Sequence, residues 1–120
     1  MNQKRTGDWG EDQAAEYLQG KRYQIITRSY RSRYGEIDLI AADDVFIAFV
    51  EVKTRKDAGF AEAREFVDLR KMERIRATAE MWLSEHEIEL QPRFDVIEIY
   101  APFGADTKKP EIRHLEDAFQ

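Results

Sequence analysis

Besides the Asp43-Asp44 pair at its centre and Arg55 at its end, four charged side chains interrupt the most apolar segment of this 120-residue chain, GEIDLIAADDVFIAFVEVKTR at positions 35–55. They are Glu36, Asp38, Glu51 and Lys53. Clustered carboxylates raise one another's pKa and are costly at a partly buried position unless a cation or a proton neutralises them. Their presence in a segment that should form a core therefore suggests a chemical role.

The chemistry that these residue types suit is hydrolysis of a phosphodiester bond. Asp38 and Glu51 could share Mg²⁺ or Mn²⁺, with the backbone carbonyl of Val52 as a third protein ligand. Such a cation polarises a phosphate and lowers the pKa of bound water. Lys53 would position that water or stabilise the developing negative charge. The structural alternative is an ordinary ion pair at a strand end, in which Glu51 pairs with Lys53 or a neighbouring arginine.

The segment that carries these charges has the pattern of a β-hairpin. Asp43 and Asp44 tolerate turn geometry, and a turn at these two residues predicts that Glu36 lies opposite Glu51. Alternation at period two gives one wholly apolar face, made of Ile37, Leu39, Ala41, Phe46, Ala48, Val50 and Val52. The other face is apolar beside the turn and ionic at the open end. Both faces should therefore be covered, as in the central strands of an α/β sandwich.

A helix is predicted near residues 8–20. Asp8 followed by Glu11 fits a capping box, and a stripe of small and apolar residues leads to Gly20. Glu11 lies on the core-facing stripe of this helix, so two roles stay open for it. It is either the capping residue at the third helical position or an additional acid of the catalytic site.

The remaining elements place the chain in the α/β class as one domain over residues 1–120. Asp68 is a plausible N-cap for a second helix, and Trp82 is expected in its core face. The predicted order is α-β-β-β-α-β with a possible short final strand. Beyond the first helix, its elements are a strand at 23–29, the hairpin strands at 34–42 and 45–54, a helix at 68–87, and strands at 93–101 and 111–115.

The composition is that of a charge-rich globular protein, with 36% charged residues, no cysteine and a net charge of -5. No apolar run approaches the ~20 residues of a membrane span, and no secretory signal is recognisable, so a cytoplasmic location is expected. The negative net charge argues mildly against a general polyanion binder.

Basic residues nevertheless gather on both sides of the acidic segment. Residues 20–35 contain five basic side chains and no acid, and Lys53, Arg55 and Lys56 follow the hairpin. Arg31 and Arg33 alternate with tyrosines, a pattern that could grip a phosphate and stack on an unpaired base. The alternatives are a solvated surface for the charges and a place in the core for Tyr30 and Tyr34.

An ordered set of motifs also carries a family resemblance. GEIDLIA, followed by EVK at 51–53, is similar to the PD-(D/E)xK nuclease signature. Together with GEDQAAEYL, GKRYQIITRSYR, FVEVKTR, RFDVIEI and HLEDAF, it resembles the YraN-like family of small bacterial proteins. This resemblance implies a restriction-endonuclease-like core, a mixed sheet flanked by helices, close to that of archaeal Holliday junction resolvases.

The resemblance also implies roles for single residues. Asp38 and Glu51 correspond to metal-binding acids, Lys53 to the catalytic lysine and Glu11 to a first-helix glutamate of some nuclease sites. Because the motif reads EID without proline, Glu36 is a possible additional acid. Nucleic-acid contacts are expected from Arg31, Arg33, Arg55 and Lys71.

The function expected from these features is metal-dependent cleavage of DNA, branched or single-stranded, by a hydrolase that uses Mg²⁺ or Mn²⁺. Two alternatives keep the fold without the chemistry: a nucleic-acid-binding module and a protein-interaction domain. The expected partner is nucleic acid, with DNA favoured, and no membrane. Nothing in the sequence marks an interface, although a homodimer is possible because junction-type nucleases often act as dimers.

Overall fold

The computed structural model describes residues 3–56 and 68–119. These residues form two α-helices and one five-stranded sheet in the order α-β-β-β-α-β-β, which confirms the predicted α/β class and the layout of a restriction-endonuclease-like core. The predicted final strand is present and longer than expected. The elements are α1 (Gln3–Gly20), β1 (Gln24–Ser32), β2 (Gly35–Ala42), β3 (Phe46–Arg55), α3 (Leu69–Ser84), β4 (Gln91–Tyr100), the 3-10 helix η1 (Gly104–Asp106) and β5 (Glu111–Phe119).

The sheet is mixed, and its strands lie in sequence order. β1, β2 and β3 form antiparallel pairs, β3 and β4 run parallel, and β4 and β5 are antiparallel. A parallel pair needs a long crossover, and here the crossover contains α3. As predicted, the side chain of Asp68 caps α3 by accepting a hydrogen bond from the backbone N–H of Lys71 at 2.8 Å. Neither helix in the described ranges is long and apolar enough to cross a membrane.

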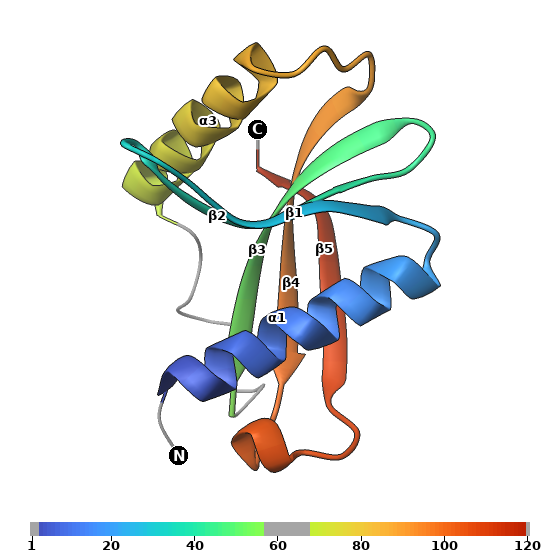
Figure 1. Ribbon diagram of the computed structural model, residues 1–120. Coiled ribbons are helices and arrows are strands. Elements are labelled where there is room, and N and C mark those ends of the chain that lie inside the picture. The colour runs from blue at the N-terminus through green and yellow to red at the C-terminus, as the bar shows by residue number, and fades with distance from the viewer. Residues whose placement is uncertain (1–2, 57–67, 120) are drawn as a thin grey trace.

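Each helix covers its own hydrophobic cluster on the sheet, so β2 and β3 are buried on both faces, as predicted. Figure 1 shows α1 crossing the lower part of the sheet and α3 lying beside the curled β1–β2 hairpin. The buried residues of the α1 cluster are Ala14, Ala15, Leu18, Tyr23, Leu39, Ala41, Ala48, Val50, Ile97 and Ile99. Those of the α3 cluster are Ile37, Ile40, Ile47, Phe49, Ile75, Ala79, Trp82, Val96 and Phe119.

Ile37 is the exception to the predicted faces of the hairpin. It packs in the α3 cluster and not with Leu39 against α1. The first residues of β2 lie directly against α3, since a Cβ added at Gly35 would stand 3.5 Å from the Cβ of Arg74. The curl of the β1–β2 hairpin toward α3 in Figure 1 therefore turns this end of β2 onto the helix.

The pairing of β2 with β3 differs by two residues from the predicted register. Leu39 pairs with Val50, so the register continues toward Asp38 beside Glu51, not toward Glu36 opposite Glu51. The turn lies one residue further along than predicted, because the backbone N–H of Asp43 bonds to the carbonyl of Phe46. A shift of two residues preserves the faces of both strands and brings the two proposed metal ligands closer together.

The first helix begins at Gln3 and not near Asp8, so the predicted capping box is wrong. Asp8 and Glu11 lie inside the helix, and Glu11 is not at its third position. Gly10 has a packing role inside this helix: a Cβ at this position would overlap the side chain of Thr54 in β3, so a larger residue would require Thr54 to move.

A buried polar cluster joins β4 and β5 near the N-terminal end of β4. The carboxylate of Asp95 is fully buried and accepts hydrogen bonds from Nε of Arg93 at 2.9 Å and from the backbone N–H of Asp117 at 3.0 Å. Nε2 of His114 lies 2.7 Å from the same carboxylate. The register of β4 and β5 shifts at this point, and Asp117 has a φ of 52°. The strand irregularity thus points a backbone donor at the buried acid.

Candidate functional site

A cleft of about 460 Å³ lies where the start of β2 meets the start of α3. The hairpin supplies Glu36, Asp38 and Glu51 to its wall, and α3 supplies Lys71. The other lining residues are Gly35, Asp68, Arg70, Arg74 and Ile75. The fold therefore brings three of the predicted acids and one predicted phosphate contact into one concave surface.

The side chain of Asp38 links β2 to β3 beyond the last residues whose backbones pair. Backbone pairing of the two strands stops at Leu39 and Val50, and Oδ2 of Asp38 then accepts the backbone N–H of Val52 at 2.8 Å. In a β-strand the N–H and C=O of one residue point to the same side. The carbonyl of Val52, the predicted third ligand, is therefore directed to the side of β3 on which Asp38 lies.

Two lysines converge on Glu51. This carboxylate is 9% exposed, and its Oε1 lies 2.5 Å from Nζ of Lys71 and 3.8 Å from Nζ of Lys53. Burial lowers the pKa of Lys53, and the positive charge of Lys71 acts in the same direction. Burial alone would lower the pKa of Lys71, but the hydrogen bond to Glu51 outweighs it and leaves that pKa raised. Glu51 is thus neutralised by cations from two elements.

The carboxyl group of Asp38 is held in an environment that disfavours its charge. Burial raises the pKa of Asp38 to about 7, and the negative charge of Glu51 adds to this effect. The hydrogen bond from Val52 acts in the opposite direction but does not offset it. A half-buried acid beside a second acid is the arrangement that a bound cation would relieve.

Comparison with known proteins identifies the family. The family model described as "Uncharacterised protein family UPF0102" matches residues 10–99. The chain belongs to the UPF0102 family. The YraN-like resemblance predicted from the motifs is therefore confirmed at the level of the family.

Relatives from several bacteria match almost the whole chain. A UPF0102 protein of Rhodococcus opacus is 46% identical and one of Acetivibrio thermocellus is 39% identical. A third, from Caldanaerobacter subterraneus, is 42% identical. The matches span 94%, 98% and 99% of this chain and 94%, 93% and 98% of the respective relatives.

The two additional acids of this UPF0102 chain occupy different places. Glu36 lines the cleft, and its Oε1 lies 3.4 Å from Nε of Arg31. Glu11 does not line the cleft; it lies on α1, 3.9 Å from a guanidinium nitrogen of Arg28. Burial raises the pKa of Glu11, and its charge contributes to the raised pKa of Asp38. Glu11 therefore acts on the cleft through its field and not as part of its wall.

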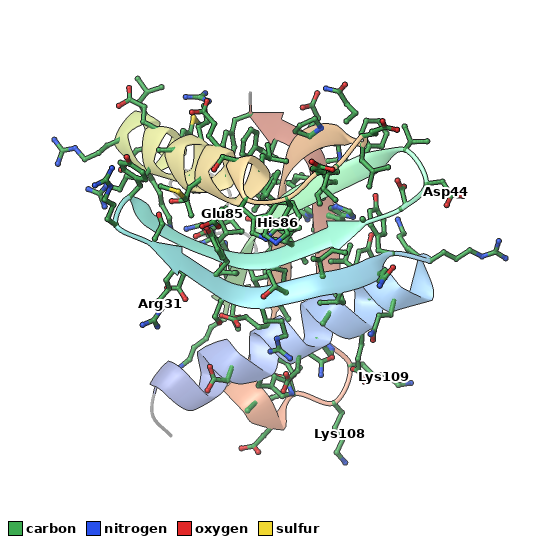
Figure 2. All side chains as sticks on the ribbon, turned by 45° about the horizontal axis from the view of Figure 1, so that its top comes forward. Arg31, Asp44, Glu85, His86, Lys108 and Lys109 are labelled. Atoms are coloured by element: carbon green, nitrogen blue, oxygen red, sulfur yellow. The ribbon has the colours of Figure 1, made fainter. Side chains whose placement is uncertain are left out.

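The predicted nucleic-acid contacts separate into two groups. Arg31 and Arg33 are exposed on the β1–β2 hairpin, and Figure 2 shows Arg31 projecting from the outer side of β1. Arg55 has a side chain only 8% exposed, and its Nε pairs with Glu98 at 3.2 Å. Arg55 therefore holds β3 to β4 and is not part of the cleft surface.

Arg70 and Arg74 are cleft residues that the sequence analysis missed. Both are exposed and line the cleft together with Lys71. Their spacing of four residues on a predicted helix, in which Asp68 was already identified as the cap, was a signal that could have found them.

The oxygen donors of the cleft fit a hard divalent cation. Asp38 and Glu51 provide carboxylates and Val52 a carbonyl, the ligand types that Mg²⁺ and Mn²⁺ prefer while they keep several waters. Within residues 3–56 and 68–119, no cluster of three or more acidic or histidine side chains has a metal-binding arrangement. The fit therefore depends on these two carboxylates, of which Glu51 is paired with the ammonium of Lys71.

The raised pKa of Asp38 predicts that Asp38→Asn stabilises the folded protein at neutral and alkaline pH. An unfolded aspartate loses its proton near pH 4, whereas folded Asp38 keeps its proton to about pH 7. The wild-type free energy of unfolding should therefore fall as pH rises through this window. Asparagine does not ionise, so the variant should exceed wild type by about 1–3 kcal/mol at pH 8 and by much less at pH 4.5.

Urea unfolding at these two pH values measures the difference. Asp44→Asn is the matched control, because Asp44 is exposed at the β2–β3 turn and projects away from the protein in Figure 2. A stability gain for Asp38→Asn that is equal at both pH values, or no gain at pH 8, would show that the Asp38 carboxylate is not destabilising.

Proposed function

We propose that this UPF0102 protein is a metal-dependent nuclease that hydrolyses phosphodiester bonds of DNA. The observation that carries the proposal is the meeting of Asp38, Glu51, Lys53 and Lys71 at one end of the β2–β3 hairpin, beside an open cleft. Two acids and two lysines at one spot are costly for a purely structural purpose, since each ion requires desolvation.

The residues of the chain have separable roles in this proposal. Asp38, Glu51 and the carbonyl of Val52 would hold Mg²⁺ or Mn²⁺, and such an ion would supply Lewis-acid polarisation of a phosphate and a water of lowered pKa. Lys53, with its depressed pKa, orients the attacking water or stabilises charge that develops on the phosphate oxygens. Glu36 and Glu11 add negative potential on either side of this centre.

The surroundings of the cleft support a polyanionic substrate. Arg70 and Arg74 flank Lys71 on α3, and Arg31 and Arg33 lie on the neighbouring hairpin. Contacts of this kind position a nucleic-acid backbone without reading its sequence. The net charge of -5 does not oppose this, because Arg70, Lys71 and Arg74 give the cleft wall a local positive charge.

The direct test is an assay of the purified full-length chain with labelled branched, nicked, single-stranded and duplex DNA and with RNA. Cleavage of DNA is expected with Mg²⁺ or Mn²⁺, and none with EDTA or with the Asp38→Ala variant. Absence of cleavage on every substrate with either metal would overturn the proposal. Salt-dependent binding that persists in Glu51→Ala would then favour a binding module without chemistry.

Lys71 competes with the metal for Glu51, which gives a prediction for Lys71→Ala. Removal of the ammonium leaves Glu51 and Asp38 without this counter-charge, so the metal-free variant should be less stable than wild type. Mn²⁺ should restore this loss, and the increase in melting temperature on adding Mn²⁺ should be larger for the variant.

Thermal unfolding with EDTA and with Mn²⁺ measures both effects. Lys108→Ala is the matched control, because Lys108 is an exposed lysine that projects from the loop after η1 (Figure 2). An Mn²⁺-induced shift in Lys71→Ala that is no larger than in wild type would mean that Glu51 does not bind the metal.

A further inference from the structure

The two tyrosines near the cleft, Tyr30 and Tyr34, have different surroundings. The sequence did not distinguish between them. Tyr30 packs against the α3 cluster, and its hydroxyl donates to Oε1 of Glu85 at 2.9 Å. Tyr34, by contrast, is 38% exposed at the tip of the β1–β2 hairpin, beside the cleft residue Gly35. Tyr34 is therefore an aromatic ring with accessible surface at the rim of the candidate site.

The hairpin tip that carries Tyr34 is hydrogen-bonded to α3. Oγ of Ser32 accepts the backbone N–H of Tyr34 at 3.0 Å and donates to Oγ1 of Thr78 at 3.4 Å. Thr78 is fully buried, and a Cβ added at Gly35 would lie 3.4 Å from its Oγ1. Because Gly35 has a φ of 153°, it reaches this position without the strain that another residue would have there.

Arg33 orients the ring and adds a positive charge to it. A guanidinium nitrogen of Arg33 donates to the Tyr34 hydroxyl at 2.9 Å, and the guanidinium carbon lies 5.0 Å from the ring centre. An aromatic ring with an arginine beside it is the pairing that proteins use to hold single-stranded nucleic acid, since the ring stacks on a base and the arginine meets its phosphate.

The separation of Tyr34 and Asp38 limits how many nucleotides can lie between a stacked base and the acids. Tyr34 and Asp38 are four residues apart along the hairpin, which at about 3.3 Å per residue is about 13 Å. At the 3.4 Å rise of a stacked strand, this spacing corresponds to at most about four nucleotides. Bases inside a duplex are stacked on both faces, so the ring reaches a base face only where a neighbour has been removed.

We propose that Tyr34, oriented by Arg33, stacks on an unpaired DNA base within a few nucleotides of the phosphate at Asp38, which makes single-stranded DNA segments the preferred substrate. The proposal rests on the nuclease function proposed above and names its substrate class. Arg70 and Arg74, on the opposite wall of the cleft, then contact the phosphates between the stacked base and the acids.

The experiment measures binding of the full-length chain to a single-stranded oligonucleotide that contains one 2-aminopurine, and to its duplex, with EDTA to prevent cleavage. Wild type should bind the single strand more tightly and quench the fluorescence of the stacked base. Tyr34→Ala should weaken single-strand binding by about tenfold and abolish the quenching, with duplex binding changed less than twofold. Tyr34→Phe should retain both properties, since its ring still stacks.

Phe103→Ala is the matched control, because Phe103 is 74% exposed on the segment before η1, and it should bind like wild type. Equal affinity of wild type for single strand and duplex, or unchanged binding and quenching in Tyr34→Ala, would overturn the inference. The two proposals fail separately. Tyr34-dependent binding without cleavage in any metal refutes only the chemistry, whereas cleavage of duplex that ignores Tyr34 refutes only the substrate class.

Discussion

Replacement of Lys53 by methionine is expected to reduce metal-dependent cleavage by about a hundredfold to a thousandfold, the usual effect of removing one group that stabilises transition-state charge. The methionine keeps most of the length of the lysine and its apolar character. Glu51 keeps Lys71 as its ion-pair partner, so the variant should still fold. Rates under single-turnover conditions, together with the melting temperature, separate lost chemistry from lost structure.

The control for this prediction is Lys108→Met, which removes an exposed lysine outside the cleft and should cleave at the wild-type rate. A Lys53→Met variant that is folded and cleaves as fast as wild type would exclude Lys53 from the chemistry. It would leave Lys71 as the remaining lysine at Glu51 that could take its place.

Asp95→Ala is expected to cause the largest loss of stability, about 3–5 kcal/mol in the free energy of unfolding. The variant removes the buried carboxylate that contacts both Arg93, which is 7% exposed, and His114. Arg93 then keeps only the half-exposed carboxylate of Glu116, at 3.4 Å, as an acidic partner among the described residues. Burial alone would raise the pKa of Asp95, but hydrogen bonds from His114 and Arg93 lower it. Its stabilising contribution is therefore present above about pH 4 and lost in stronger acid.

Urea unfolding at pH 7 measures this loss. Glu111→Ala is the matched control on β5, because Glu111 has a side chain 64% exposed and lies 3.6 Å from Arg113 in an exposed ion pair. Such pairs contribute at most about 1 kcal/mol. If the two variants lose equal stability, the buried cluster has no special role in holding β5 to β4.

The part of the fold that depends on local patterns could be predicted from the sequence. Alternation of side chains gave the strands of the hairpin, and Asp68 correctly marked the start of α3. The family resemblance rested on motifs that lie mostly within these elements. The register of the hairpin was predicted incorrectly. The side chain of Asp43 accepts hydrogen bonds from the backbone N–H groups of Val45 and Phe46, and the turn lies one residue further along than predicted.

The errors arose where distant contacts override local preference. The helix start was predicted near Asp8, but α1 begins at Gln3, and Gly10 within it lies against Thr54 of another element. Arg55 was expected among the nucleic-acid contacts, and in the structure its Nε pairs with Glu98 on β4. The same holds for Asp95, since its contacts with His114 and Asp117 need the pairing of two strands that no periodicity specifies.

The candidate site depends partly on local patterns and partly on contacts between distant elements. The placement of Asp38 and Glu51 on one face followed from alternation within a single hairpin. The contact of Lys71 with Glu51, and the cleft wall formed by Arg70 and Arg74, required the packing of α3 over that hairpin.

The parallel pairing of β3 with β4 has a consequence for the order of folding. The hairpin with Asp38 and Glu51 closes over a short stretch of chain, whereas Glu51 pairs with Val96 only after the whole crossover has returned. Contacts between residues so distant in sequence form late. During folding, Asp38, Glu51 and Lys53 are therefore expected to come together before the α3 ammonium of Lys71 reaches them.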